Sequence, residues 1–173
     1  MNILITGSSG FLGSALLQAL PRRGHTITRL LRTSSSPDTP SWDPLRGTIS
    51  PGAFTNIDAV IHLAGENIGD GRWTAAKKER IRQSRVQGTR VLCEHLARLD
   101  HKPSVLLAAS GAGIYGDRGD EWVDEGSAPG EGFLATAAQE WEKATHPANQ
   151  AGIRVVNLRL GVVLSRTGGA LQK

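Results

Sequence analysis

The chain has 173 residues, 39% of them hydrophobic and 21% charged, with a formal net charge of +4, a makeup typical of one ordinary globular domain. Because Cys93 is the only cysteine, an internal disulfide and a cysteine-rich zinc site are excluded, and a reducing compartment is expected. No secretion signal opens the chain, and its apolar runs are far shorter than the roughly 20 residues of a membrane helix. We therefore expect a cytoplasmic protein with no metal site and no membrane contact.

The positive charge raises the question of a nucleic-acid partner. Basic residues are densest between 77 and 90, but Glu79 and Glu94 interrupt them along one predicted helix, and no nucleic-acid-binding motif is present. Most of this charge is explained by solvation of a helix surface. We expect a small-molecule substrate, no nucleic-acid partner, and a homodimer as the assembly to consider.

Strands and helices are predicted to alternate along the chain. Short apolar runs predict strands, and apolar residues at helical spacing predict helices. Strands are expected at 2–6, 26–31, 58–63, 105–109 and 154–158, and helices at 11–20, 74–99 and 133–148. The last helix is expected to end at Pro147, and the Ser- and Pro-rich segment 33–51 to be loop with a short edge strand near Thr48. This alternation predicts an α/β fold, a Rossmann-type doubly wound parallel sheet with helices on both faces, as one domain over 1–173.

A glycine-rich turn lies between the first strand and the first helix. Gly7 permits a tight turn, Gly10 lets the backbone approach a pyrophosphate, and Gly13 allows close packing of the helix. Free N–H groups at the start of the helix then meet the anion. A loop that merely connects strand to helix is the alternative, and a nucleotide-triphosphatase loop is a poorer fit because Ser14 follows Gly13. The turn predicts a dinucleotide site made by Gly7, Ser9, Gly10, Phe11, Leu12 and Gly13.

The end of the second predicted strand favours NADP(H) over NAD. An NAD site usually places Asp or Glu about 20 residues beyond the glycines, to hold the ribose hydroxyls. That place holds Arg32, and no acidic residue occurs in 1–37. A guanidinium with the hydroxyls of Thr33 and Ser34 suits a 2′-phosphate. A solvated Arg32, or Arg29 in its place, is the alternative.

A second motif follows the central strand and reads His62-Leu63-Ala64-Gly65-Glu66-Asn67-Ile68. With the glycine turn, it resembles the extended short-chain dehydrogenases/reductases, and within them an atypical NAD(P)-dependent epimerase-like subgroup. The segments 113–116 (Gly-Ile-Tyr-Gly) and 159–164 (Arg-Leu-Gly-Val-Val-Leu) are also similar to that subgroup. The resemblance covers essentially the whole chain as an N-terminal portion. It implies that a C-terminal substrate-binding region is absent from this chain.

The resemblance also implies roles for particular residues. It places Leu63, Ala64 and Gly65 along the adenosine side of the cofactor and Arg85 near the phosphates. The backbone of Leu160, Gly161 and Val162 is expected near the nicotinamide carboxamide, and Ser110 at the mouth of the substrate cleft. His62 itself is expected to be a buried or strand-end residue with a hydrogen-bond partner, and a catalytic role is the alternative. Glu66 and Asn67 are expected either to cap the loop or to meet the substrate.

The chain departs from the catalytic pattern of that family, in which a Tyr acid is followed four residues later by a Lys. Its single tyrosine, Tyr115, is followed at that distance by Gly119. On the helix that normally carries the motif, Phe133 and Ala137 take the places of the Tyr and the Lys. Neither side chain can donate a proton.

Three candidate catalytic residues remain, Ser110, Tyr115 and Glu66, although Gly111 is the alternative occupant of the usual Ser or Thr position. We expect an NADP-dependent oxidoreductase or a nucleotide-sugar-epimerase-like protein that acts on a small carbonyl or hydroxyl compound. The alternative, motivated by the missing Tyr and Lys, is a non-catalytic NADP(H)-binding module that senses redox state or regulates a partner.

Overall fold

A five-stranded parallel sheet forms the centre of the computed structural model, which describes residues 1–33, 36, 39–69, 71–166 and 168–169. Its strands are β1 (Asn2–Thr6), β2 (Thr26–Leu30), β5 (Ala59–His62), β6 (Val105–Gly111) and β7 (Arg154–Leu160). They lie in the order β2-β1-β5-β6-β7, and every neighbouring pair is parallel. The strand order therefore reverses between β1 and β5, and open α/β sheets bind ligands beyond the carboxyl ends of the strands at such a point.

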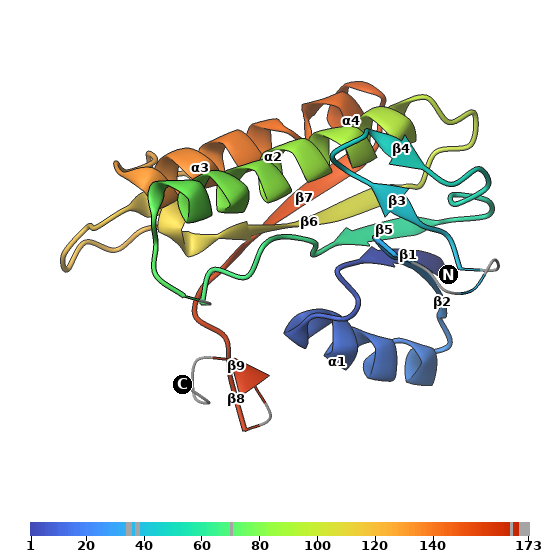
Figure 1. Cartoon of the computed structure of the whole chain (residues 1–173), viewed down its shortest axis with the longest axis horizontal. Coiled ribbons are helices and arrows are strands. Elements are labelled where there is room, and N and C mark those ends of the chain that lie inside the picture. The colour runs from blue at the N-terminus through green and yellow to red at the C-terminus, as the bar shows by residue number, and fades with distance from the viewer. Residues whose placement is uncertain (34–35, 37–38, 70, 167, 170–173) are drawn as a thin grey trace.

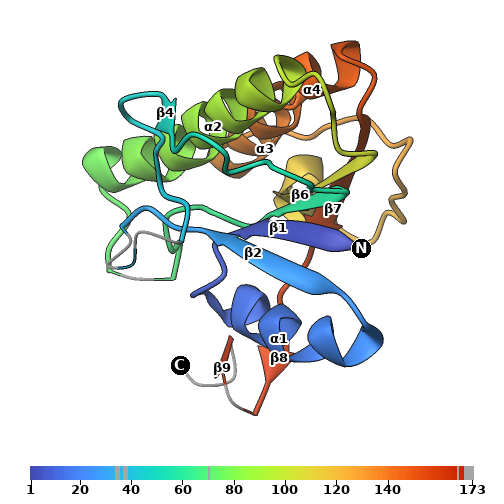
Figure 2. The same ribbon diagram turned by 90° about the vertical axis from the view of Figure 1, so that its right-hand side faces the viewer.

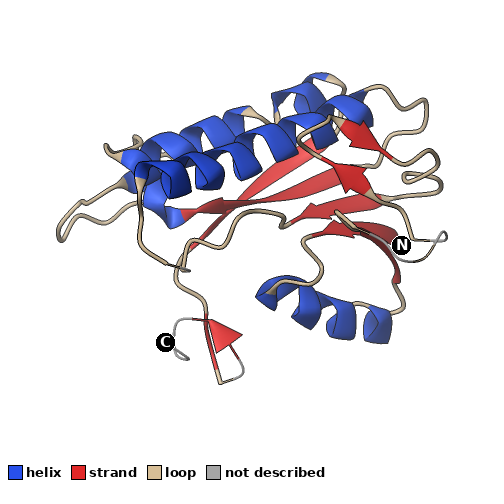
Figure 3. Cartoon of the chain, in the orientation of Figure 1, coloured by secondary structure: helices blue, strands red, loops and turns tan. Residues whose placement is uncertain are grey.

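Helices cover both faces of this sheet (Figure 1), as the sequence predicts. On one face lies α1 (Phe11–Ala19), and on the other lie α2 (Ala75–Ala97), α3 (Phe133–Lys143) and α4 (His146–Gln150). The view turned by 90° shows the same three layers (Figure 2), and Figure 3 shows the strands between the two layers of helices. Two short 3₁₀ helices, Pro21–Arg23 and Ala112–Tyr115, complete the helical elements of the described residues.

The alternation of side chains along the strands divides the core into two clusters. Ile3, Ile5 and Ile61 face α1, where Leu16 and Leu17 pack against them. The intervening residues face the other layer and form a larger cluster with α2 and α4, which includes Leu4, Val60, Leu92, Leu96, Leu106 and Ala148. Central strands that are buried on both faces are typical of a parallel sheet between helices.

The predicted helix over 133–148 is wrong in its extent, because the structure has two helices there. The first, α3, ends at Lys143, and α4 begins at His146. Pro147 lies in the first turn of α4. A proline is tolerated at that position because its missing N–H has no partner within the helix, so Pro147 begins a second helix instead of ending the first.

Short strands outside the main sheet form two hairpins. The strand expected near Thr48 is β4 (Thr48–Ile49), which pairs with β3 (Trp42–Asp43) and not with the edge of the main sheet. Near the end of the described chain, β8 (Leu164–Ser165) pairs with β9 (Gly168–Gly169). Within the described residues, no helix combines the length and the apolar character needed to cross a membrane.

Candidate nucleotide site and active site

The glycine turn leaves β1 and enters α1 in a conformation that depends on two glycines. Gly7 has φ +67°, and a Cβ there would lie 2.6 Å from the carbonyl carbon of Leu63. A Cβ on Gly13 would lie 2.6 Å from the Cα of Ser8. Any larger residue at either position would push the turn away from its neighbours. Because Gly7 and Gly13 have no side chains, the turn can pack closely against the segment after β5 and against the first turns of α1.

At the start of α1, no capping or acidic side chain competes with an anion for the backbone N–H groups of the first turn. Gly10 is the residue before the helix and makes no side-chain cap, and the first turn contains no acidic residue. Ser9, Gly10 and Phe11 are exposed. A helix end of this kind can receive an anion through its backbone N–H groups and its dipole. The binding of a pyrophosphate by Gly7 to Gly13 stays a prediction.

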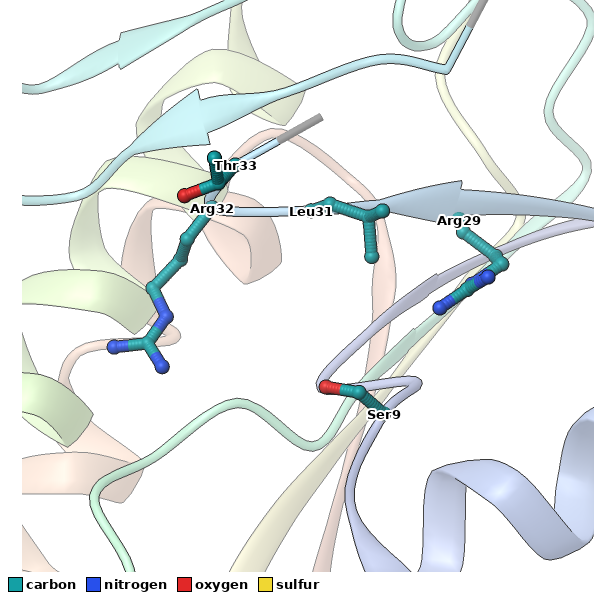
Figure 4. A pocket seen from close by; sticks show the side chains of 5 residues that line it. All are labelled: Ser9, Arg29, Leu31, Arg32 and Thr33. Atoms are coloured by element: carbon teal, nitrogen blue, oxygen red, sulfur yellow. The ribbon is translucent and has the colours of Figure 1, made fainter. Parts of the chain in front are cut away.

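An open pocket of about 420 Å³ lies beside this turn, at the end of β2. The guanidinium of Arg32 and the hydroxyl of Ser9 point into it from opposite sides, and Leu31 and Thr33 line it as well (Figure 4). None of the ion pairs among the described residues includes Arg32. Arg29, the alternative cation, also lines the pocket, and its Nε donates to Ser8 Oγ at 3.1 Å. Ser34, the other predicted hydroxyl, lies outside the described residues.

The segment after β5 lies directly against the glycine turn. The backbone N–H groups of Leu63 and Ala64 each donate to Thr6 Oγ1 at 3.3 Å. Gly65 lies close to Arg85, since a Cβ on this glycine would be 3.3 Å from the guanidinium carbon. Leu63 to Gly65 thus lie at the switch point, between the glycine turn and α2.

Arg85 is held by carbonyl groups and an aromatic ring. Its Nη1 donates to the carbonyl oxygens of Glu66 (3.0 Å) and Ile81 (3.2 Å), and its guanidinium lies 5.0 Å from the ring centroid of Trp141. Burial lowers the pKa of Arg85, while the charge of Glu66 acts in the opposite direction. Without a carboxylate in ion-pair contact among the described residues, this cation is available to an anionic group near Gly65.

Glu66 belongs to a different cluster, at the start of α2. Its carboxylate accepts from Lys77 Nζ at 2.8 Å and lies 3.7 Å from Arg80 Nε. The hydrogen bond from Lys77 lowers the pKa of Glu66, and the positive charges of Lys77 and Arg80 add to this shift. Glu66 is therefore ionised at neutral pH, and it carries no proton to donate.

Ser110 and Tyr115 are joined by two residues that the sequence interpretation did not assign. Ser110 Oγ donates to Glu142 Oε1 at 2.7 Å, and Arg159 binds both oxygens of Glu142, at 2.9 and 3.0 Å. Arg159 Nη1 also donates to the Tyr115 hydroxyl at 2.8 Å. Burial alone would raise the pKa of Glu142, but the hydrogen bonds from Arg159 and Ser110 outweigh it and lower the pKa. The hydrogen bonds that Arg159 makes to Glu142 and to Tyr115 raise the pKa of Arg159 in turn.

Phe133 and Ala137 lie on α3, where the resemblance predicts the missing Tyr and Lys. Phe133 is the first residue of α3, and its ring meets Trp73 edge to face with centroids 5.8 Å apart. Lys78 Nζ lies 5.6 Å from the centroid of the same ring. Ala137 is buried. No acid–base pair occupies these two positions.

The last predicted cofactor segment follows β7. Leu160 ends that strand, and Val162 is 77% exposed in the loop that follows. A Cβ on Gly111, at the end of β6, would lie 3.9 Å from both the carbonyl oxygen of Leu160 and the backbone nitrogen of Gly113, which is ordinary van der Waals contact. Because β1, β5, β6 and β7 are parallel, the glycine turn, Leu63 to Gly65, and Leu160 to Val162 all lie at one edge of the sheet.

A parallel sheet with this strand order, and with a glycine turn at its switch point, defines a Rossmann-type domain. The model of the NAD dependent epimerase/dehydratase family matches residues 3–171, and the chain belongs to this family. The epimerase family protein Mb2239 of Mycobacterium bovis is 44% identical over 172 residues, which are 99% of this chain and 56% of that protein. The chain thus spans about half the length of such relatives.

Two solved structures have the same fold as this chain over nearly its whole length. The crystal structure of the human epimerase family protein SDR39U1 (isoform 2) with NADPH has a TM-score of 0.87 and 32% identity, covering 99% of this chain and 57% of that one. The nucleoside-diphosphate sugar epimerase of Corynebacterium glutamicum has a TM-score of 0.86 and 39% identity, covering 99% and 36%. The family resemblance and the Rossmann fold expected from the sequence are confirmed.

Proposed function

We propose that the chain binds NADP(H) across the carboxyl ends of β1, β2 and β5. The observation that carries this proposal is the pocket in which Arg32 and Ser9 face each other beside the glycine turn. Arg32 would hold the 2′-phosphate, and the N-terminus of α1 would hold the pyrophosphate. The choice of NADP(H) over NAD is supported by the human relative that was solved with NADPH.

The remaining proposed contacts with the cofactor lie along the carboxyl ends of the strands. Leu63, Ala64 and Gly65 would lie along the adenosine and ribose, with Arg85 toward the phosphates. Leu160 to Val162 would bind the carboxamide through their backbone. We propose that the substrate pocket is completed by a C-terminal region of the longer proteins, since the relatives extend well beyond the matched part.

For the reaction we propose an NADP-dependent oxidoreductase or nucleotide-sugar-epimerase-like conversion of a small carbonyl or hydroxyl compound. The nicotinamide supplies or accepts the hydride when it is bound. A carbonyl that gains a hydride also needs a proton. Tyr115 is the best placed of the three candidates, because its oxygen accepts from Arg159 and its own proton stays available. Ser110 already donates to Glu142, and Glu66 is ionised.

A non-catalytic NADP(H)-binding module is the second candidate, and Phe133 and Ala137 favour it. A protein that only reads the cofactor needs no proton donor on α3. Partner binding would then depend on the bound form, so a pull-down with NADP, NADPH or no nucleotide should capture different proteins. Identical partners in all three samples would count against this candidate.

Calorimetric titration with NADPH and with NADH tests the cofactor proposal, and NADPH oxidation with a panel of carbonyl compounds tests the reaction. We expect tight binding of NADPH and weaker binding of NADH. Binding of neither would remove the basis for the proposal. Turnover of any carbonyl, abolished in Tyr115→Phe with unchanged NADPH affinity, would decide between the two candidates in favour of the enzyme.

A further inference from the structure

A continuous series of buried hydrogen bonds runs from the glycine-turn strand to α3. His62 Nδ1 lies 2.6 Å from Thr6 Oγ1, and His62 Nε2 lies 2.9 Å from Thr89 Oγ1. Trp141 Nε1 donates to the same oxygen of Thr89 at 2.8 Å. Thr6, His62 and Thr89 are fully buried. The series joins β1, β5, α2 and α3, and none of its members is needed for the chemistry proposed above.

The direction of these bonds follows from the number of donors and acceptors. Thr6 Oγ1 has two lone pairs, and two backbone N–H groups are directed at them. The N–H of Ala64 donates to this oxygen at 3.3 Å, and the N–H of Leu63 is shared between it and the carbonyl oxygen of Thr6, each at 3.3 Å. The hydroxyl proton of Thr6 therefore goes to His62 Nδ1, and His62 carries its own proton on Nε2 and donates to Thr89. The opposite tautomer would direct three donors at Thr6 Oγ1. Burial lowers the pKa of His62 to about 4, so the ring is neutral at neutral pH, as this pattern requires.

We propose that His62 is a positioning residue that, through the Thr6 hydroxyl, fixes the backbone of Leu63 and Ala64 against the glycine turn. The turn packs against the same backbone, because Gly7 leaves no room for a Cβ beside Leu63. One imidazole thus sets the spacing between the two segments that meet the cofactor. The consequence for the cofactor rests on the proposed function, but the consequence for the backbone does not.

The tautomer of His62 is the first test, and it needs no cofactor. Nitrogen-15 NMR of the histidine-labelled chain at pH 7 should show a protonated Nε2 and an unprotonated Nδ1 for His62. A protonated Nδ1 would overturn the proposal. This measurement uses the unaltered chain, so it stands even where a variant fails to fold.

Amide hydrogen exchange of the cofactor-free chain is the second test. Thr6→Val keeps the shape of the side chain but removes the hydroxyl acceptor. The amide of Ala64 loses its hydrogen bond to that oxygen, so it should exchange about fivefold faster, as expected for the loss of one hydrogen bond of about 1 kcal/mol. The amide of Leu63 keeps the carbonyl oxygen of Thr6 as an acceptor and should change less. Thr6→Ser restores the hydroxyl and should restore the protection. Unchanged exchange in a folded Thr6→Val protein would overturn the proposal.

The affinity for NADPH, measured on the same variants, connects the backbone to the cofactor. We expect weaker binding in Thr6→Val and near-native binding in Thr6→Ser. Thr145→Val is the matched control, because Thr145 is also buried and donates to the carbonyl oxygen of Glu142, remote from the glycine turn. It should lose stability without a change in affinity. If the unaltered chain binds no NADPH while the exchange and NMR results hold, the proposed function fails and the positioning role of His62 stands.

Discussion

Replacing Glu142 by Gln tests the ion pair that links β6, β7 and α3. Glu142 accepts three hydrogen bonds, two from Arg159 and one from Ser110, and its side chain is only 15% exposed. A glutamine can keep its oxygen near Ser110, but it turns an amide NH₂ toward one N–H of Arg159 and removes the charge. Hydrogen bonds to charged groups contribute about 1.5–3 kcal/mol each, so we expect the free energy of unfolding to fall by about 2 kcal/mol at pH 7.

Urea unfolding followed by tryptophan fluorescence measures this loss, with Glu121→Gln as the matched control. Glu121 makes the same two-pronged pair with Arg118, but its side chain is 56% exposed, so solvent screens the pair and no resolvable change is expected. Equal losses in the two variants would refute the reasoning.

The pH dependence of the same measurement gives a second check. Burial opposes the shift, but hydrogen bonds from Arg159 and Ser110 lower the folded-state pKa of Glu142 below its unfolded value. Its stabilisation is therefore fully present above the unfolded pKa, near 4.3, and is lost as the pH falls through the lower folded value. The difference between the unaltered chain and Glu142→Gln should be largest at neutral pH and should shrink in acid. A difference that does not vary with pH would contradict this assignment of charge.

Three further predictions concern single sites. Gly13→Ala should cost about 1–3 kcal/mol of stability by overpacking against Ser8, while Gly152→Ala, at φ +85° with open space around it, should show only the cost of backbone strain, and urea unfolding measures both. Burial raises the pKa of the Cys93 thiol to about 12, so a disulfide reagent at pH 8 should react with it only after unfolding, and rapid reaction in the folded chain would contradict its buried placement. Tyr115→Phe should abolish any turnover of a carbonyl substrate and leave NADPH affinity unchanged, and residual turnover at the native rate would remove Tyr115 as the proton donor.

The local features of the fold, those set by residues close together in the chain, could be predicted from the sequence. The glycine turn between 6 and 13 needs only a strand, a turn and a helix in succession, and the main strands follow from short apolar runs. The burial of His62 at the end of β5 could be foreseen for the same reason. The break between α3 and α4 could not, because Pro147 is compatible with both the end and the start of a helix.

Contacts between distant segments could not be predicted in this way. Arg159 reaches Glu142 and Tyr115 only because β7 pairs with β6 in a register that places Arg159 beside Ser110. No spacing in the sequence indicates that register. The sequence also does not decide between the two roles expected for Glu66, because its ion pair with Lys77 depends on how the loop after β5 folds back onto the first turn of α2.

The most direct test of the cofactor site is the ratio of the dissociation constants for NADPH and NADH, measured for the unaltered chain, Arg32→Ala and Arg29→Ala. Loss of one charged contact with the 2′-phosphate is expected to weaken NADPH binding by roughly 10- to 100-fold. We predict this loss in Arg32→Ala with NADH affinity unchanged, and a native ratio in Arg29→Ala, whose side chain is engaged by Ser8. A native ratio in Arg32→Ala would contradict the assignment of Arg32 to the 2′-phosphate.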